Sequence, residues 1–364
     1  MGINSFMLKL IISIFIYFCP AIAISDEVVL VSLFSVQNQI SKFGGGKTFN
    51  QCRNLPSLPH KVESVSYYTD KKSSVVDLTL HARFLELRKV ISDAQNYLAT
   101  QNIHLITSTS SSRSSIAECS VKHLLQFAKD DAFTGSDDIR GGGAIRLMSV
   151  TPLMTYLLLR DAGSIEPEQD ILIRSWITRL VDRLLWLENK YKYDNNIEDW
   201  TGAAFALSAV ALNRPQLLEH AIQIARKKSQ MVNADGFLPA ELDRGQMAVV
   251  YNLSALQALS IIISVAQANG IDLLSPPSHD GLFRMMQRML RIIEDPESFL
   301  PFATTPEAIS SVHFDRQNMG WLLTYFLKSK DLRALKIICD KKPLYSWRTG
   351  GDWFVLFGNP NACS

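Results

Sequence analysis

Two groups of polar side chains interrupt apolar, helix-forming sequence in the second half of the chain, and their residue types suit chemistry on an anionic sugar. The first group is Asn195, Asn196 and Trp200, and the second is Arg244 and Tyr251. On helices with 3.6 residues per turn, the spacing of Asn196 and Trp200 predicts one shared face. Arg244 and Tyr251 are seven residues apart, which predicts that they lie two turns apart on one face. Arg and Asn side chains hold a carboxylate, a Tyr hydroxyl moves a proton, and a Trp ring stacks on a pyranose.

A uronate polymer can be cleaved without water by β-elimination, and these residue types match what that reaction requires. The C5 proton is very weakly acidic while the neighbouring carboxylate is charged, so hydrogen bonds or a cation must first neutralise the carboxylate. A base then removes the C5 proton, and an acid protonates the departing O4. One phenol can do both jobs where proton and leaving group lie on the same side of the sugar. β-Mannuronate and β-glucuronate meet that condition, and α-guluronate does not.

These requirements give each residue a candidate role. We expect Asn196 to neutralise the carboxylate through its amide N–H, and Tyr251 to act as base and acid. Arg244 can lower the pKa of the phenol and can also pair with the carboxylate. Trp200 would form a sugar platform, with Asn195 as a second substrate-binding residue. On residue type alone two plainer alternatives stay open. A helical Tyr is more often a core residue with a satisfied hydroxyl, and Arg244 could be an ordinary arginine at a helix start.

The same two stretches resemble a known enzyme family. The first reads NNIEDW and is similar to the NNHxxW motif of the mannuronate-specific alginate lyases, the polysaccharide lyases of family 5. The second reads GFLPAELDRGQMAVVYNLSAL and resembles that family's GYLPxELxRxxxAxxYxxxAL block. The fifty-four residues from Ile197 to Tyr251 match the family's spacing without a gap. The resemblance continues through AQANGIDL to SWRTGGDWFVLF, and more faintly back to Cys52.

The resemblance implies an (α/α) toroid with a deep groove and carries functional residues over by position. The family's Asn, Arg, Tyr and Trp fall on Asn196, Arg244, Tyr251 and Trp200. The family's motif histidine is Ile197 here, and an isoleucine can neither transfer a proton nor stabilise a charge. If Tyr251 handles both proton transfers, elimination survives with an altered substrate preference. If the histidine carried part of the carboxylate neutralisation, its loss could cost on the order of 10²–10³ in rate.

Two functions are consistent with this pattern. The preferred one is an exported polysaccharide lyase that cleaves a β-1,4-linked uronate polymer, mannuronan-like or glucuronan-like, by β-elimination. The alternative is a catalytically silent, lyase-like protein that binds an anionic exopolysaccharide during secretion. The retained Tyr251 and Arg244 favour the enzyme, and Ile197 favours the silent binder.

Further positions are suggested by the resemblance near the two ends of the chain. Arg348 in SWRTGG matches the family's arginine before a Gly-Gly, and it either binds a second uronate or stabilises the loop. A family lysine early in the chain has no clear counterpart, because Lys71 and Lys72 lie near its place but Tyr67 and Tyr68 align there as well.

Composition excludes several other classes of function. The 364 residues are 47% apolar and 20% charged, with a net charge of +2, so an anion site must be local and nucleic acid is not an expected partner. The seven histidines are scattered without metal-ligand spacing, so we expect no metal and no cofactor. A glycoside hydrolase would need two carboxylates across the groove, and nothing in the sequence links Glu241 to Asp137 and Asp138 for that purpose.

The N-terminus has the features of a secretory signal. Lys9 provides a positive charge, LIISIFIYF an apolar core, and Ala21-Ile22-Ala23 a cleavage site of small residues. We therefore expect residues 1–23 to be removed, the mature protein to be periplasmic and no longer membrane-bound, and the chain to be a monomer. An uncleaved anchor is the alternative, but the apolar run is short for a membrane span. We expect a lead-in over residues 24–50, one toroid domain over 51–357 and a tail over 358–364.

Periodic apolar residues predict an all-α fold of eight to ten amphipathic helices in inner and outer pairs, without a β-rich domain. Helices are expected from residue 76 past 94, and over 117–132, 144–162, 168–191, 244–269, 280–294, 316–329 and 331–340. Gly141-Gly142-Gly143 is expected to separate two of these helices. The tract from Thr107 to Ser115, TSTSSSRSS, is expected to be a mobile polar loop.

Four cysteines remain once the leader is removed, and an even number in an exported protein permits two disulfides with three possible connectivities. The resemblance favours a bond between Cys52 and Cys119, because the lyase family has cysteines at similar places. A bond between Cys339 and Cys363 would then tie down the C-terminal tail. Free buried cysteines remain an alternative.

Overall fold

A computed structural model describes residues 29–43, 45, 51–275, 280–303 and 316–363, so the predicted signal peptide lies outside the described residues. Within these ranges helices dominate, and a short antiparallel pair, β1 (Tyr345–Ser346) and β2 (Gly351–Asp352), is the sheet. The α-helices are α1 (Val36–Phe43), α2 (Leu78–Thr107), α3 (Ser110–Lys129), α4 (Ile139–Met148), α5 (Val150–Asp161), α6 (Pro167–Lys190), α7 (Asn196–Leu212), α8 (Pro215–Met231), α9 (Pro239–Leu242), α10 (Ala248–Ala268), α11 (Asp280–Glu294), α13 (Trp321–Ser329), α14 (Leu332–Lys341) and α15 (Trp353–Phe357). Short 3₁₀ segments are η1 (Gly245–Met247), η2 (Pro296–Phe302), η3 (Arg316–Asn318), η4 (Trp347–Thr349) and η5 (Pro360–Cys363).

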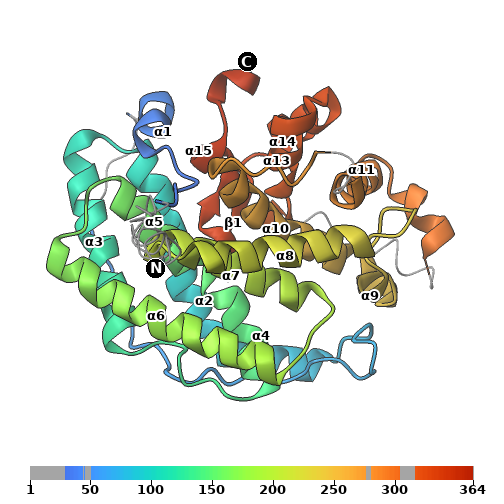
Figure 1. Cartoon of the computed structure of the whole chain (residues 1–364), viewed down its shortest axis with the longest axis horizontal. Helices are drawn as coiled ribbons and strands as arrows, with labels where there is room; N and C mark the ends of the chain where they lie inside the picture. Colours follow the sequence, from blue (N-terminus) through green and yellow to red (C-terminus); the bar gives the residue numbers. More distant parts are fainter. Residues whose placement is uncertain (1–28, 44, 46–50, 276–279, 304–315, 364) are drawn as a thin grey trace, which may run out of the picture.

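The helices form an inner and an outer layer, as the sequence predicts. Helices α5, α7 and α10 are buried along nearly their whole length. Helices α3, α6, α8 and α11 each bury one stripe of apolar residues and expose the opposite face, which is the pattern of a helix that covers a core. Figure 1 shows α7 and α10 in the middle of the molecule with α8 running alongside and α3 and α6 on the outside.

Small side chains allow the inner helices to pack closely. Helix α7 has the sequence GAAFALSAVAL after Thr201, and Gly202 lies directly against α10 and α8. A Cβ atom on Gly202 would come within 2.7 Å of Ile262 and 3.3 Å of Ile224. Glycine is therefore needed here for the close approach of three helices.

Two stretches expected to interrupt helices are largely helical. The three glycines lie inside α4. Close packing explains two of them, because a Cβ atom on Gly142 would come within 2.6 Å of Leu187 on α6, and one on Gly141 within 2.4 Å of a backbone oxygen. The tract predicted to be a mobile polar loop enters α3 at Ser110. Arg113 holds this junction by donating to the backbone oxygens of Leu105 and Ser108 at 3.0 and 2.9 Å.

The described part of the predicted lead-in packs on the toroid. Leu30 and Phe34 are buried in the core, and the Phe34 ring stacks on Phe357 with 5.3 Å between centroids. The backbone N–H groups of Leu30 and Val31 donate to side chains at the ends of α7 and α10. Residues 29–43 therefore belong structurally with the body of the domain.

Two helical stretches, Ile139–Asp161 and Gly245–Ala268, are long and apolar enough to cross a membrane by length and composition alone. Most of each stretch is buried inside the protein, as expected for core helices of this fold.

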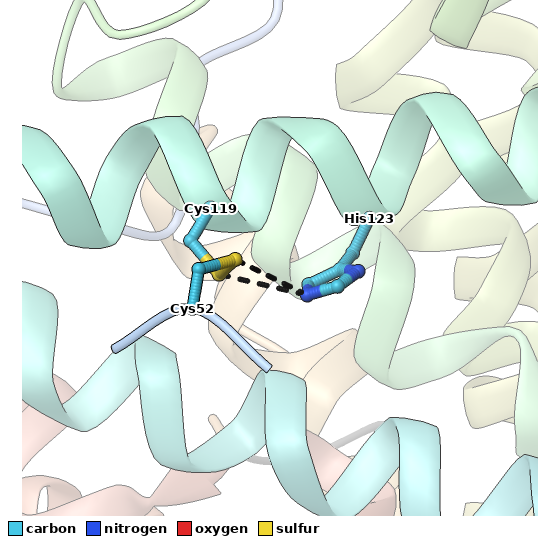
Figure 2. Close-up of side chains that lie close together, drawn as sticks. All are labelled: Cys52, Cys119 and His123. Atoms are coloured by element: carbon cyan, nitrogen blue, oxygen red, sulfur yellow. Dashed lines mark hydrogen bonds between the residues drawn. A yellow bond between two sulfur atoms is a disulfide. The ribbon is translucent and has the colours of Figure 1, made fainter. Parts of the chain in front are cut away.

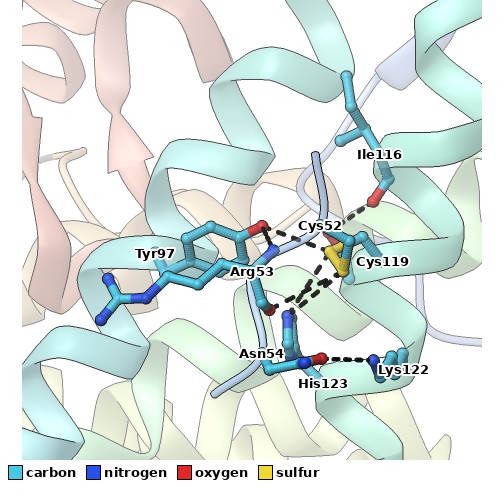
Figure 3. Close-up of a disulfide and its surroundings, with 9 residues drawn as sticks. Cys52, Arg53, Asn54, Tyr97, Ile116, Cys119, Lys122 and His123 are labelled. Carbon is cyan, nitrogen blue, oxygen red and sulfur yellow. Dashed lines mark hydrogen bonds between the residues drawn. A yellow bond between two sulfur atoms is a disulfide. The ribbon is translucent and has the colours of Figure 1, made fainter. Parts of the chain in front are cut away.

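Both predicted disulfides are present. Cys52 is bonded to Cys119 on α3, and Cys339 on α14 is bonded to Cys363 in η5. Figure 2 shows the first disulfide facing His123, whose Nε2 lies 3.5 Å from Cys119 Sγ. Figure 3 shows the surrounding contacts, in which the Tyr97 hydroxyl accepts from the backbone N–H of Arg53.

We predict that the double variant Cys52→Ser/Cys119→Ser loses about 2–4 kcal/mol of unfolding free energy, because the bond closes a long loop in the unfolded chain. The two cysteines are 67 residues apart. Denaturant unfolding measures the loss, and non-reducing peptide mapping verifies the bond. Free thiols at both positions in the wild type would refute the assignment.

His123 should make stability depend on pH. Burial, and then the charge of Lys122, lower the pKa of His123 from about 6.5 to about 4. Between those values the unfolded chain binds a proton that the folded protein does not, so the free energy of unfolding falls as the pH drops from 6.5 toward 4. Above pH 6.5 this contribution to stability is fully present. The melting temperature of His123→Gln should fall less steeply across this range than that of the wild type. Parallel curves would show that His123 does not contribute.

Candidate active site

Arg244 and Tyr251 lie in contact, although they do not share a helix. Helix α9 ends at Leu242, Arg244 lies in the turn before η1, and Tyr251 lies in the first turn of α10. Gly245 has a φ of +57°, which lets the backbone turn between them. The guanidinium carbon of Arg244 lies 3.7 Å from the centroid of the Tyr251 ring. The prediction of one continuous helical face is therefore wrong, and the predicted proximity is confirmed.

Asn196 is joined to this pair through Glu241. Asn196 is the first residue of α7, and both its backbone N–H and its side-chain Nδ2 donate to Glu241 Oε1, at 2.5 and 2.9 Å. The other carboxylate oxygen of Glu241 lies 3.8 Å from Arg244 Nη1. Glu241 is fully buried, so it contributes through its contacts with Asn196 and Arg244. Its position on α9, after a turn, hid this link from the sequence pattern.

Two further tyrosines surround the hydroxyl of Tyr251. The Tyr68 hydroxyl forms a hydrogen bond with it, and the Tyr67 hydroxyl lies 3.4 Å away. Both residues come from the segment before α2, which Gln246 ties to the Arg244 turn by donating to the backbone oxygen of Ser74 at 2.8 Å. Of the residues that the resemblance left open near the start of the chain, Tyr67 and Tyr68 therefore lie at the Tyr251 hydroxyl.

The electrostatic environment of Tyr251 differs from the expected one. Burial raises the pKa of the Tyr251 hydroxyl above its ordinary value, and Tyr67 raises it further. Arg244 lowers it, as predicted, but is outweighed. Without substrate Tyr251 is therefore a neutral phenol at physiological pH.

Two more arginines lie near the tyrosines. Arg88 on α2 stacks on Phe84, with 3.9 Å between its guanidinium carbon and the ring centroid, and donates to Ser64. Burial, and then the charge of Arg348, lower the pKa of Arg88 to about 10, while Tyr67 and Tyr251 raise it. The charge of Arg348, a residue expected from the resemblance, therefore acts on Arg88, a residue that no motif indicates.

The structure contradicts the sugar platform assigned to Trp200. The side chain is 1% exposed, and its indole N–H donates to Ser254 Oγ on α10 at 3.1 Å. A ring buried between two helices cannot stack on a sugar, so Trp200 fixes α7 against α10. The spacing of Asn196 and Trp200 predicts which face of the helix they share, but it does not predict whether that face is covered by another helix.

Asn195 and Ile197 flank Asn196 at the start of α7. Asn195 is the N-cap, and its side-chain oxygen accepts from the backbone N–H of Ile197 at 3.1 Å. Both side chains are half-buried. Capping accounts for the choice of Asn at position 195 without any substrate contact. Ile197 follows Asn196 in the first turn of α7.

Within the described ranges, Cys52, Cys119 and His123 are the group of potential metal ligands that lie close together. The two sulfur atoms are bonded to each other, so they are not available as thiolate ligands in this structure.

Comparisons with known proteins find alginate lyases. A family model for alginate lyase matches residues 115–299. The alginate lyase of Cobetia marina is 26% identical over 326 residues, covering 86% of this chain and 85% of that protein. The alginate lyase of Pseudomonas fluorescens is 29% identical over 243 residues, and that match spans 65% of each chain.

Solved structures show the same fold. Alginate lyase A1-III from Sphingomonas species A1 superposes with a TM-score of 0.71 at 15% identity, covering 90% of this chain and 96% of the other. A variant of alginate lyase A1-III complexed with tetrasaccharide gives a TM-score of 0.74 at 16% identity, covering 90% of this chain and 95% of the other. The predicted (α/α) toroid is thus confirmed.

Fold and family together define the class of this protein as a polysaccharide lyase. Because the family match spans half of the chain, the protein belongs to the alginate lyase family.

Proposed function

We propose that this chain is an exported lyase that cleaves a β-1,4-linked uronate polymer, mannuronan-like or glucuronan-like, by β-elimination. The observation that carries the proposal is the convergence of Arg244, Tyr251 and Asn196 from separate elements. A cation, a proton-transfer group and an amide donor are the three functions that elimination beside a carboxylate requires.

The geometry suggests how the steps are divided. An amide NH₂ carries two hydrogens, so Asn196 keeps one after donating the other to Glu241. Asn196 is 2% exposed, so a substrate carboxylate must enter against it to accept that hydrogen. Arg244 adds positive charge on the same side and favours the phenolate form of Tyr251. The reaction starts from the phenolate, which forms when Tyr251 releases its own proton to solvent. The phenolate takes the C5 proton and passes that proton to O4 as the glycosidic bond breaks, so Tyr251 ends the step as the phenolate. The C5 proton and the O4 leaving group lie on the same side of the sugar in β-mannuronate and β-glucuronate, so one group can reach both.

Two solved relatives support the assignment of these positions. Structures of alginate lyase A1-III complexed with tetrasaccharide exist for a variant with a histidine replaced by alanine and for one with a tyrosine replaced by phenylalanine. In that chain the two replaced residues are 54 positions apart, as Ile197 and Tyr251 are here. This supports placing Tyr251 at the reaction centre and Ile197 at the family's histidine position.

The alternative is a silent protein that binds the polymer during secretion, and the observation that favours it is Ile197. Its half-buried aliphatic side chain adjoins Asn196, where a proton-handling group would otherwise stand. The contact of Arg244 with Tyr251, and the contacts of both Arg244 and Asn196 with Glu241, favour the enzyme, because a protein that merely bound the polymer would not need a phenol held against an arginine.

Export is part of the proposal, and we expect the mature chain to begin near Ile24 in the periplasm. The sequence Ala21-Ile22-Ala23 motivates this expectation. Intact-mass measurement of protein from the periplasmic fraction tests it. A full-length chain retained in the inner membrane would overturn the export proposal.

Tyr251→Phe should abolish most turnover while leaving binding nearly unchanged, because it keeps the ring under Arg244 and removes the hydroxyl that moves the proton. We expect kcat on mannuronan to fall by a factor on the order of 10² or more. Release of unsaturated uronate ends is followed by ultraviolet absorbance, and affinity is measured separately by calorimetry. Equal release by wild type and Tyr251→Phe would contradict the mechanism.

The companion variant Ile197→His should raise turnover on mannuronan, or create it if the wild type has none, by restoring a charge-stabilising group beside Asn196. Ile197→Leu is the matched control, because it keeps an apolar side chain of the same size. A wild type that binds a uronate polymer and releases no unsaturated ends would favour the silent binder.

A further inference from the structure

We propose that Glu241 is a positioning residue that sets the orientation of both Asn196 and Arg244. The inference rests on the proposed function, since the two groups it orients are those assigned to carboxylate neutralisation. Glu241 itself is fully buried and does not reach the substrate side.

The contact with Asn196 fixes the amide. Glu241 Oε1 accepts from two donors of one residue, the backbone N–H and side-chain Nδ2 of Asn196. The two bonds close a ring that holds the Asn196 side chain in one rotamer. Charge-assisted hydrogen bonds of this kind are roughly twice as strong as neutral ones. With one amide hydrogen directed at Glu241, the other has a defined direction.

The contact with Arg244 fixes the cation. Glu241 Oε2 lies 3.8 Å from Arg244 Nη1, and the side chains of Glu241 and Arg244 are 0% and 13% exposed. The guanidinium is thereby held between the carboxylate and the Tyr251 ring. A buried carboxylate that lacked this cation would carry a large desolvation cost, so the pair is coupled.

The rear of the site reinforces this arrangement. Lys228 on α8 is fully buried, and its Nζ donates to the backbone oxygens of Asp194 and Asn195 at 2.7 and 3.2 Å. The same Nζ forms ion pairs with Glu198 and Asp199 at 3.0 and 3.7 Å. The start of α7 is therefore held from one side by Lys228 and from the other by Glu241.

The consequence for chemistry concerns charge. A carboxylate beside a uronate would repel it, but Glu241 is fully buried and its two oxygens face Asn196 and Arg244. Misplacing a neutralising group by about 1 Å can cost a factor on the order of 10² in rate. Loss of Glu241 should therefore lower kcat more than it weakens ground-state binding.

The test is a double-mutant cycle with Glu241→Gln, Asn196→Ala and the combination, measured on mannuronan in the full-length mature protein. Glu241→Gln keeps the side-chain volume and removes the charge. We expect kcat to fall by a factor on the order of 10² with a much smaller change in KM. Because Glu241 acts through Asn196, the double variant should be far less impaired than the product of the two single effects.

Asp331→Asn is the matched control. Asp331 is a partly buried carboxylate at the start of α14 that accepts from the backbone N–H of Arg333 and pairs with its side chain, away from α7 and α10. The Asp331→Asn variant should have a lower free energy of unfolding and an unchanged kcat. In Glu241→Gln, by contrast, the side-chain amide resonance of Asn196 should shift in NMR spectra of selectively labelled protein.

The outcomes are distinct. A Glu241→Gln protein with wild-type kcat, or effects that multiply independently in the cycle, would overturn the inference. If the wild type releases no unsaturated ends from any polymer, the proposed function fails. The positioning role of Glu241 is then tested by comparing wild type and Glu241→Gln in the Asn196 resonance and in the affinity for mannuronan oligosaccharides. An unmoved resonance with unchanged affinity overturns the inference. If Glu241→Gln does not fold, the same double-mutant cycle is measured with Glu241→Asp, which keeps the charge but shortens the side chain by one methylene.

Discussion

The packing of α7 against α10 is the constraint on which the site depends. Asn196 begins α7 and Tyr251 lies in the first turn of α10, so the register between these two helices decides whether the groups meet. Gly202 allows the close approach, and the bond from Trp200 to Ser254 holds the register one turn from the site. A buried polar bond of this kind is specific because a slipped register would leave both groups unsatisfied.

Charged side chains of both signs meet around the site. Arg244 lies against the Tyr251 ring, while Glu241 and Asp199 near the start of α7 are fully buried. Burial of Tyr251 keeps its phenol protonated before substrate arrives, and its hydroxyl is bonded within the tyrosine cluster. A uronate that reacts at Tyr251 must therefore replace at least one of these hydrogen bonds, which couples substrate entry to activation of the phenol.

Helix content, the inner and outer layers, both disulfides and the meeting of Arg244 with Tyr251 could be predicted, because apolar periodicity and family resemblance report on them directly. Trp200 was misassigned because helical spacing defines a face without saying what covers it. Glu241, Tyr68 and Arg88 were missed or left undecided because their contacts join segments far apart in the chain. The glycines of α4 resemble a helix break in the sequence, because close helix approach, which requires glycine, has no local signature.

The central claim is elimination at a uronate whose C5 proton and O4 leaving group lie on the same side. The measurement that tests it most directly is the ultraviolet absorbance of new unsaturated ends when the wild-type protein is mixed separately with mannuronan, guluronan, glucuronan and hyaluronan. The account predicts a rising signal with mannuronan or glucuronan and none with guluronan. A signal from guluronan alone, or cleavage of any of these polymers without unsaturated ends, would contradict it.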